Sequence, residues 1–446
     1  MNVEIIALGG YSEVGKNMTA IKVGDEIVVL DCGFYLPSLV EFQEGGGNKK
    51  YLTPKGLQKI GAIPDDTYLE SNKDKVKAFV VSHAHLDHVG AIPYVAGKYN
   101  APVIATPYTI EVLRTLARDD DVKIKNKLMP TKTGSIIKVS KNISIELINM
   151  THSTIDVASI AVHTPEGVIV YTNDFKFDNH PVVGKKPDYK RLKELGDEGN
   201  VRALILDSLY SAKGMKTPSE KVARELLKDV MLGAENKGHA IFITSFASHM
   251  ARLKSMIDFA KKLDRKVVFM GRSLSKYTKA AENVGLVDYS KDANILTYSR
   301  QVQKMLKTIE KNRDKYVVVC TGSQAEPNAI LSRIGNKQLP FNFVHDDHII
   351  FSCKTIPVEP NISNREKLEK QLTSRGVRIF RDIHVSGHGS IEDMRDMIDM
   401  VKPEIIIPGH GDYKVVSNIE QLTDVIGYKP GKNLIYLTNG KSLKLK

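Results

Sequence analysis

The feature that most constrains this chain is a ten-residue stretch, residues 81–90, which reads V-S-H-A-H-L-D-H-V-G. It holds three imidazoles and one carboxylate: His83, His85, Asp87 and His88. The apolar run before the stretch predicts a buried strand and the segment after it predicts a helix start, so the polar side chains occupy a strand-to-helix turn. Strand alternation would place the first three on one face, and the turn would swing the fourth toward them. Imidazole and carboxylate groups together suit zinc or another first-row metal.

Length and composition bound the architecture around this turn. At 446 residues, with 42% hydrophobic residues, the chain exceeds one ordinary core and predicts two or three domains. No window approaches about eighteen consecutive apolar residues, so no membrane span is expected. The N-terminus lacks a basic segment followed by an apolar one, and we expect a cytoplasmic protein. The net charge of +12 is compatible with a nucleic-acid partner, although lysine-rich solvated faces explain it equally well.

The hydrophobic pattern changes along the chain. The first 150 residues alternate short strand-like runs with turn residues. From about Thr217 onward, long helical patterns alternate with continuous apolar strands. This alternation favours βαβ units around a parallel sheet, folded as a domain of its own.

Three further metal-type side chains follow apolar, strand-like runs: His152, Asp174 and His410. At the ends of strands, such side chains can project into a shared crevice. Each is a weak signal alone, because a lone histidine after a strand is more often a capping or core residue. Together with the turn they supply seven candidate ligands, which is what two adjacent metals need while keeping open positions for water.

These motifs resemble those of a known superfamily. The pattern H-x-H-x-D-H at 83–88, followed in order by His152, Asp174 and His410, resembles the metallo-β-lactamase superfamily. Further signatures narrow the resemblance to its β-CASP nucleases and, within them, to the ribonuclease J family. They are Asp207 in L-D-S, T-S-F-A-S at 244–248, and H-V-S-G-H-G at 384–389.

The resemblance implies an α/β fold, a metallo-β-lactamase αββα sandwich with an inserted α/β β-CASP domain. On this reading, residues 1–208 and 355–446 form the two parts of the metallo-β-lactamase domain, and residues 209–354 form the β-CASP domain. A short form of this kind is similar to the archaeal members. The resemblance leaves open whether the chain forms a homodimer.

The family scheme implies a site with two zinc ions, for which manganese is the alternative because it uses the same ligands. One ion is implied to bind His83, His85 and His152. The other is implied to bind Asp87, His88 and His410, with Asp174 bridging the two.

Three residues are implied to act in catalysis beside these ions. Asp87 would accept a proton from the attacking water, and His388 would protonate the leaving 3′ oxygen. Asp207 would support the site by hydrogen bonding.

Contacts to RNA phosphates are expected from small and polar residues near helix starts, where backbone N–H groups favour an anion. Segments 245–248 and 322–326 are each predicted to open a helix, and the resemblance implies a pocket for a 5′ monophosphate. A serine before a helix is equally well explained as an N-cap. The residues placed near phosphates are Ser245, Ser248, Ser323, His384, Ser386 and Gly387.

The function implied is hydrolysis of single-stranded RNA from a 5′-monophosphate end in the 5′→3′ direction, with additional endonuclease activity left open. One alternative is a purely endonucleolytic β-CASP enzyme. A DNA nuclease of the crosslink-repair branch is less expected, because those members typically lack the last metal histidine, here His410. Small-molecule metallohydrolases such as glyoxalases lack the α/β insertion, and a non-catalytic RNA-binding scaffold would not need the full ligand set.

One motif points elsewhere. Residues 10–16 read G-Y-S-E-V-G-K, which resembles a nucleotide-binding P-loop. Asn17 replaces the Ser or Thr that the P-loop requires, and a strand-like run follows where a helix is needed. ATP binding is therefore not expected.

Overall fold

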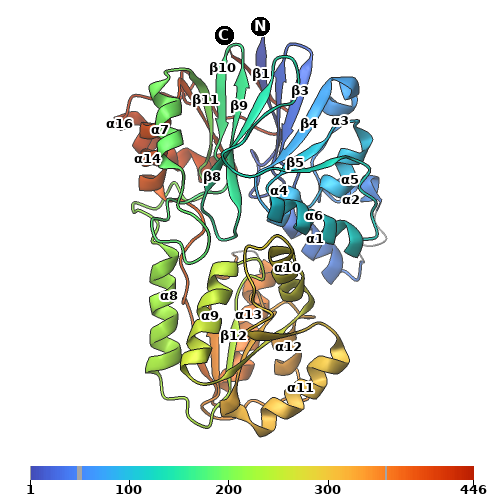
Figure 1. Ribbon diagram of the computed structural model, residues 1–446, viewed down its shortest axis with the longest axis vertical. Coiled ribbons are helices and arrows are strands. Elements are labelled where there is room, and N and C mark those ends of the chain that lie inside the picture. The colour runs from blue at the N-terminus through green and yellow to red at the C-terminus, as the bar shows by residue number, and fades with distance from the viewer. Residues whose placement is uncertain (1, 48–52, 357–358, 446) are drawn as a thin grey trace. The chain divides into compact units, whose positions relative to one another are not determined.

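The computed structural model describes residues 2–47, 53–356 and 359–445. The chain divides into two compact units (Figure 1). Unit 1 comprises residues 1–179, 185–217 and 386–446, and unit 2 comprises residues 180–184 and 218–385.

Unit 1 is built on two sheets. The strands of the seven-stranded sheet, in spatial order, are β19 (Ser442–Leu445), β1 (Val3–Gly9), β2 (Met18–Val23), β3 (Glu26–Leu30), β4 (Val76–Val81), β5 (Val103–Ala105) and β6 (Leu128–Pro130). Those of the six-stranded sheet are β18 (Ile405–Gly409), β11 (Val201–Asp207), β10 (Gly167–Tyr171), β9 (Val157–Thr164), β8 (Ser144–Met150) and β7 (Ile136–Lys138).

Central strands of the two sheets, such as β4 and β10, are buried on both faces, which explains why they read as continuous apolar runs. In β4, Ala78 and Val80 join a cluster shared by the two sheets, whereas Phe79 and Val81 face the opposite way toward helices. Side chains alternate across a strand, so one short run fills two cores. The two sheets thus form a sandwich with helices on its outer faces, and the predicted αββα class is confirmed.

The helices of unit 1 cover the two outer faces (Figure 1). Beside the seven-stranded sheet lie α1 (Leu36–Glu44), α2 (Pro54–Lys59), α3 (Thr67–Glu70), η2 (Lys73–Lys75), α4 (Leu86–Val89), α5 (Ile92–Val95), η3 (Ala96–Lys98) and α6 (Pro107–Asp119). Beside the other sheet lie α7 (Tyr189–Asp197), α14 (Ile391–Val401), α15 (Tyr413–Val416), η6 (Ser417–Ile419) and α16 (Glu420–Val425).

Helix α14 shows how local sequence sets an element that borders the site. Ser390 and Asp393 form a capping box at its start, which satisfies backbone N–H groups that a helix leaves unpaired. Met394, Met397 and Val401 follow at helical spacing and are buried against the sheet. The capping box fixes the chain at Ser390, directly after residues 384–389.

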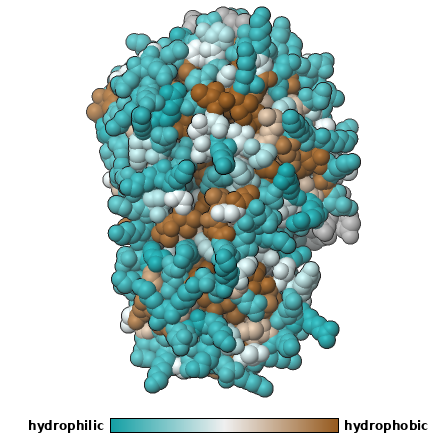
Figure 2. Space-filling model, viewed as in Figure 1, coloured by the Kyte–Doolittle hydropathy of each residue, from teal (hydrophilic) through white to brown (hydrophobic). Residues whose placement is uncertain are grey.

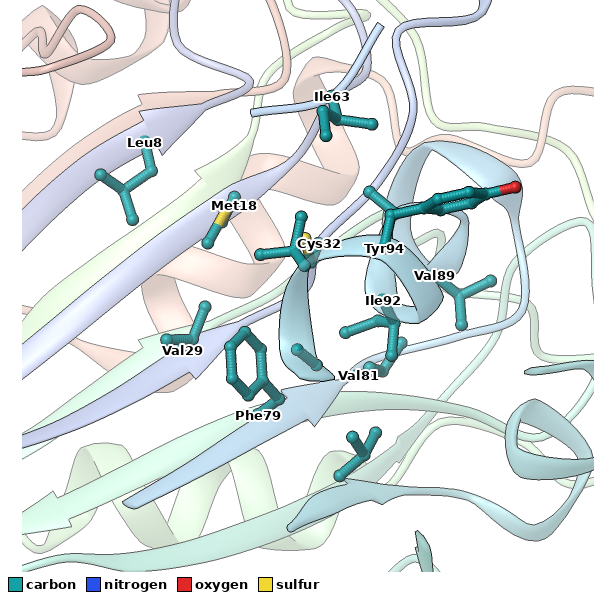
Figure 3. Packing of buried hydrophobic residues seen from close by; sticks show 14 of the residues in the cluster. Leu8, Met18, Val29, Cys32, Ile63, Phe79, Val81, Val89, Ile92 and Tyr94 are labelled. Carbon is teal, nitrogen blue, oxygen red and sulfur yellow. The ribbon is translucent and has the colours of Figure 1, made fainter. Parts of the chain in front are cut away.

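A hydrophobic cluster supports the turn that carries the histidines (Figure 3). Phe79 and Val81 from β4 pack with Val89 of α4 and Ile92 of α5, and all four side chains are fully buried. The loop after β3 lies against α4, because a Cβ on Gly33 would lie 1.7 Å from the carbonyl oxygen of Asp87 in that helix. The turn is therefore a rigid part of the core, as the position of a preorganised site requires.

Unit 2 contains one sheet in which every pairing is parallel, with strands in the order β14 (Ala293–Leu296), β13 (Lys266–Met270), β15 (Tyr316–Cys320), β12 (Ile241–Thr244), β16 (His348–Phe351) and β17 (Arg378–Phe380). Its helices are α8 (Glu220–Lys228), η4 (Asp229–Gly233), α9 (Met250–Lys262), α10 (Arg272–Asn283), α11 (Ser299–Lys311), η5 (Arg313–Lys315), α12 (Ile330–Gly335) and α13 (Glu359–Thr373). The predicted parallel βαβ domain is confirmed.

The end of unit 2 differs from the predicted boundary at residue 354. The unit continues to Val385 because β17 pairs in parallel with β16 at the sheet edge, with His348 opposite Arg378. Its start, after Thr217, also lies later than the predicted residue 209. The segment up to Thr217 stays with unit 1, where the Thr217 backbone N–H donates to Asp393.

The surface of the described residues is largely polar. Figure 2 shows hydrophilic residues over most of one face, with hydrophobic residues in separate patches. Among the described residues, no helix is long and apolar enough to cross a membrane.

Candidate metal centre

The four candidate ligands of the turn lie in the segment that directly follows β4. His83 and His85 lie in the turn, and His85 is the residue before α4. Asp87 and His88 belong to α4, which begins at Leu86, several residues earlier than the helix start predicted after residue 90. The predicted strand-to-helix turn is present, but it is tighter than predicted, so one helical turn carries two candidate ligands.

The other three candidates come from strand ends of the second sheet. His152 follows β8, Asp174 follows β10 and His410 follows β18. His410 has a left-handed φ of 64°, and Asn173 next to Asp174 has one of 53°. Such backbone conformations are costly for residues with side chains and are common at functional sites.

The structure brings all seven candidates together in unit 1. One group that could hold a metal consists of His83, His85, His152 and Asp174. A second consists of Asp87, His88, Asp174 and His410. Within each group, the potential ligand atoms lie within 4.8 Å of one another.

Asp174 belongs to both groups, and its two oxygens face different ones. Its Oδ2 lies 3.7 Å from Nε2 of His83 and 3.5 Å from Nε2 of His152. Its Oδ1 lies 3.1 Å from Nε2 of His88 and 3.4 Å from Nδ1 of His410. A carboxylate placed in this way can bridge two cations.

The chemistry of the donors fits a pair of divalent metals. Nε2 of His83 is buried and has no hydrogen-bond partner among the described residues, as expected of an atom reserved for another ligand. Burial and neighbouring imidazoles hold the pKa of His83 and of His152 well below the ordinary value, and burial lowers the pKa of His85 to about 4. These imidazoles are neutral near pH 7, the state in which they bind metals.

The carboxylates supply the matching negative charge. Burial alone would raise the pKa of Asp174, but the imidazoles of His410, His88 and His388 hold it well below its usual range. Burial would likewise lower the pKa of His88, yet the carboxylates Asp174, Asp87 and Asp31 raise it well above the ordinary value. The same negative field favours a cation at this position.

Asp31 orients His88 through a hydrogen bond, although it was not among the site residues predicted from the sequence. It is fully buried, has a left-handed φ of 58°, and accepts a hydrogen bond of 2.7 Å from Nδ1 of His88. It also accepts from the Ser82 backbone N–H, the Ser82 hydroxyl and the Tyr171 hydroxyl, at 2.7 to 2.8 Å. Since an ionised carboxylate only accepts, Asp31 keeps a proton on Nδ1 of His88, which leaves Nε2 as the nitrogen that would bind a metal. The only sequence signal was an acid directly after an apolar strand.

Asn17 links two candidate ligands, although its segment first resembled a P-loop. Its amide nitrogen lies 3.1 Å from Nε2 of His88 and donates to the backbone oxygen of Asp87. Its amide oxygen lies 3.1 Å from Nδ1 of His410. The loop at residues 10–17 therefore contributes to the candidate metal centre.

His388 and Asp207 form a pair beside the two groups. Nδ1 of His388 lies 2.8 Å from Oδ2 of Asp207, while its Nε2 lies 3.9 Å from Oδ2 of Asp174. Burial would lower the pKa of His388, but Asp207 and Asp174 raise it to about 9. The imidazole is thus protonated near pH 7, with one N–H held by Asp207 and the other directed toward the metal groups.

Two of the predicted phosphate contacts lie in unit 1 beside His388. The Ser386 hydroxyl accepts a hydrogen bond of 3.0 Å from the His388 backbone N–H. The Gly387 carbonyl lies 2.7 Å from Nδ1 of His152, and a Cβ on Gly387 would lie 2.8 Å from the His152 ring. Gly387 therefore positions a candidate ligand, a role that the sequence analysis did not assign.

The remaining predicted phosphate contacts belong to unit 2: Ser245, Ser248, Ser323 and His384. Ser245 follows β12 and Ser323 follows its neighbour β15, so both lie at the carboxyl edge of the parallel sheet. The prediction that 322–326 opens a helix is wrong, because α12 begins at Ile330. An irregular turn precedes it, in which the Ile330 N–H bonds to the Thr321 hydroxyl. Ser323 is thus not at a helix N-terminus.

Family models match three successive stretches of the chain. Residues 12–229 match the family model of the metallo-beta-lactamase superfamily, and residues 238–368 match that of the ribonuclease J beta-CASP domain. Residues 377–430 match a Zn-dependent metallo-hydrolase RNA specificity domain.

Named relatives cover nearly the full chain. Ribonuclease J of Methanocaldococcus jannaschii is 42% identical over 99% of each chain. Ribonuclease J of Pyrococcus abyssi is 41% identical over 99% of this chain and 97% of its own. Ribonuclease J 1 of Streptococcus pyogenes is 31% identical over 99% of this chain and 74% of its own. A crystal structure of a protein of unknown function from Enterococcus faecalis V583 shares the fold, with a TM-score of 0.64 at 16% identity over the whole of both chains.

Proposed function

The chain belongs to the ribonuclease J family and is a metal-dependent ribonuclease, and we propose that it degrades single-stranded RNA from a 5′-monophosphate end with two zinc ions. The observation that carries the proposal is Asp174, whose two oxygens each face a different group of candidate ligands. Manganese is the alternative metal, because it accepts the same nitrogen and oxygen donors.

In this proposal, His83, His85 and His152 would hold one ion, Asp87, His88 and His410 would hold the other, and Asp174 would be shared by both. When bound, the ions supply Lewis acidity toward the scissile phosphate and activate the attacking water.

Two side chains of the protein transfer the protons of the hydrolysis. Asp87 is the most exposed of the ligand carboxylates, with 20% of its side chain accessible, and it accepts the proton of the attacking water. His388 donates a proton from Nε2 to the leaving 3′ oxygen, while Asp207 holds the other ring nitrogen. The 5′-terminal nucleotide departs with its own 5′ phosphate and a 3′ hydroxyl, and the shortened RNA keeps the scissile phosphate as its new 5′ phosphate.

RNA binding rests on phosphate contacts. The match over residues 377–430 and the net charge of +12 support a polyanionic substrate. We assign the phosphate contacts to Ser245, Ser248, Ser323, His384, Ser386 and Gly387. The proposal places the protein in the cytoplasm and is compatible with a monomer or a homodimer.

The test uses RNA oligonucleotides labelled at either end and carrying a 5′ monophosphate, triphosphate or hydroxyl. The proposal predicts mononucleotides from the first digestion product onward and faster turnover of the monophosphate. Asp87→Asn should bind the same RNA but not cleave it. Internal fragments without mononucleotides or end preference would instead establish the purely endonucleolytic alternative.

A further inference from the structure

The Tyr210 ring packs against His388, the proposed proton donor. Its ring centroid lies 5.6 Å from that of His388, with the two planes at 69°. The Tyr210 backbone forms a bridge with Ser390, two residues after His388. Tyr210 is therefore fixed against the same segment that carries His388.

Lys213 lies directly over this ring. Its ammonium nitrogen is 3.3 Å from the Tyr210 ring centroid, which is a close cation–π contact. Its backbone is held too, because its N–H donates to the Tyr210 carbonyl at 3.0 Å and its carbonyl accepts from the Ile391 N–H at 3.2 Å. The residue is half-buried, so its charge is held over the Tyr210 ring.

We propose that Lys213 is a specificity-determining residue that supplies positive charge to the subsite for the 5′-terminal phosphate of RNA. The inference rests on the proposed function, in which His388 protonates the oxygen that leaves with the 5′-terminal nucleotide. The phosphate of that nucleotide then lies on the His388 side of the scissile bond, where Tyr210, Ser386 and Lys213 are found. A terminal phosphate carries more charge than an internal one, so a fixed ammonium favours it.

This arrangement gives each of the three residues a distinct task. The Ser386 hydroxyl offers a neutral hydrogen bond, which any phosphate or hydroxyl could use. The Tyr210 ring holds the ammonium at a set position. Lys213 adds to the discrimination between a charged and an uncharged 5′ end, because its contribution depends on the charge of its partner.

The experiment compares kcat/KM on 5′-monophosphate and 5′-hydroxyl oligonucleotides for the wild type, Lys213→Gln and Lys213→Arg. A charge-assisted contact predicts that Lys213→Gln loses about tenfold on the monophosphate substrate and little on the hydroxyl substrate. Lys213→Arg keeps the charge and should retain most of the preference. Lys216→Gln is the matched control, since Lys216 lies three residues on and pairs with Asp396.

The outcomes separate this inference from the function on which it rests. A wild type without any 5′-monophosphate preference would overturn the proposed function. A wild type with that preference, equally strong in Lys213→Gln, would overturn the inference alone. Equal losses on both substrates, together with a lower melting temperature, would show that Lys213 only supports the Tyr210 loop, and would also overturn it.

Discussion

Replacing Asp31 by Asn should weaken metal binding without touching any candidate ligand. The amide oxygen of an asparagine can still accept from the Ser82 N–H, now 2.7 Å from Oδ1 of Asp31. Its NH2 group would then replace Oδ2 and face three donors, at His88, Ser82 and Tyr171. The hydroxyls can rotate and accept, whereas His88 must give up its Nδ1 proton and carry it on Nε2. That proton would occupy the direction of the proposed metal.

The size of the effect follows from these contacts. Loss of a partner that orients a metal-binding histidine typically costs about 10- to 100-fold in affinity. That corresponds to about 1.4–2.8 kcal/mol in binding free energy. The mismatched buried hydrogen bonds add roughly 1–3 kcal/mol of lost folding stability. The affinity of the ion proposed at His88 should fall most.

Metal affinity is best measured on stripped protein by competition with a coloured chelator, alongside thermal unfolding. Asp66→Asn is the matched control, because Asp66 is equally buried but bonds to Lys98 and Tyr99 and contacts no candidate ligand. Both variants should lose stability, and only Asp31→Asn should lose metal affinity. Unchanged affinity in Asp31→Asn, or an equal loss in Asp66→Asn, would refute the reasoning.

Three further predictions concern stability. Arg252 is fully buried and paired with Glu220, so Arg252→Ala should lower the free energy of unfolding, measured with denaturant, by about 3–5 kcal/mol. Adding Glu220→Met removes the unpaired carboxylate and should restore part of that free energy. A double variant no more stable than Arg252→Ala would contradict this account. Burial lowers the pKa of His348 to about 4, so on acidification the unfolded chain takes up the proton before the folded chain does. The free energy of unfolding should therefore fall by roughly 2 kcal/mol as the pH drops from about 6.5 to about 4. His348→Leu should make the free energy of unfolding less dependent on pH in this range. Chelation should lower the melting temperature of the wild type, but not that of a variant with Asp174→Ala, which already lacks the bridge.

Much of the candidate site was predictable because its chemistry is local in sequence. His83, His85, Asp87 and His88 stand together, and the structure gathers them with three residues from later strand ends. Asp174 illustrates why strand ends were informative. The carboxyl ends of neighbouring strands meet at one edge, so polar residues there converge whatever their separation.

The unpredicted parts depend on contacts between distant segments. Asn17 contacts His88 and His410, which lie 71 and 393 residues further along the sequence. The residues of its own loop do not predict these contacts. Unit 2 extends to Val385 because β17 pairs with β16. No change of composition in the sequence marks this boundary. Before α12, the chain follows an irregular turn in which the Ile330 N–H bonds to the hydroxyl of Thr321, nine residues earlier.

The central claim is that two metal groups share Asp174 and act together on RNA. It is tested most directly by titrating chelator-stripped protein with zinc while following bound metal and RNA cleavage in the same samples. The account predicts two ions per chain, with cleavage absent in the stripped protein and complete only once both have bound. A single bound ion at full activity, or cleavage by the stripped protein, would contradict it.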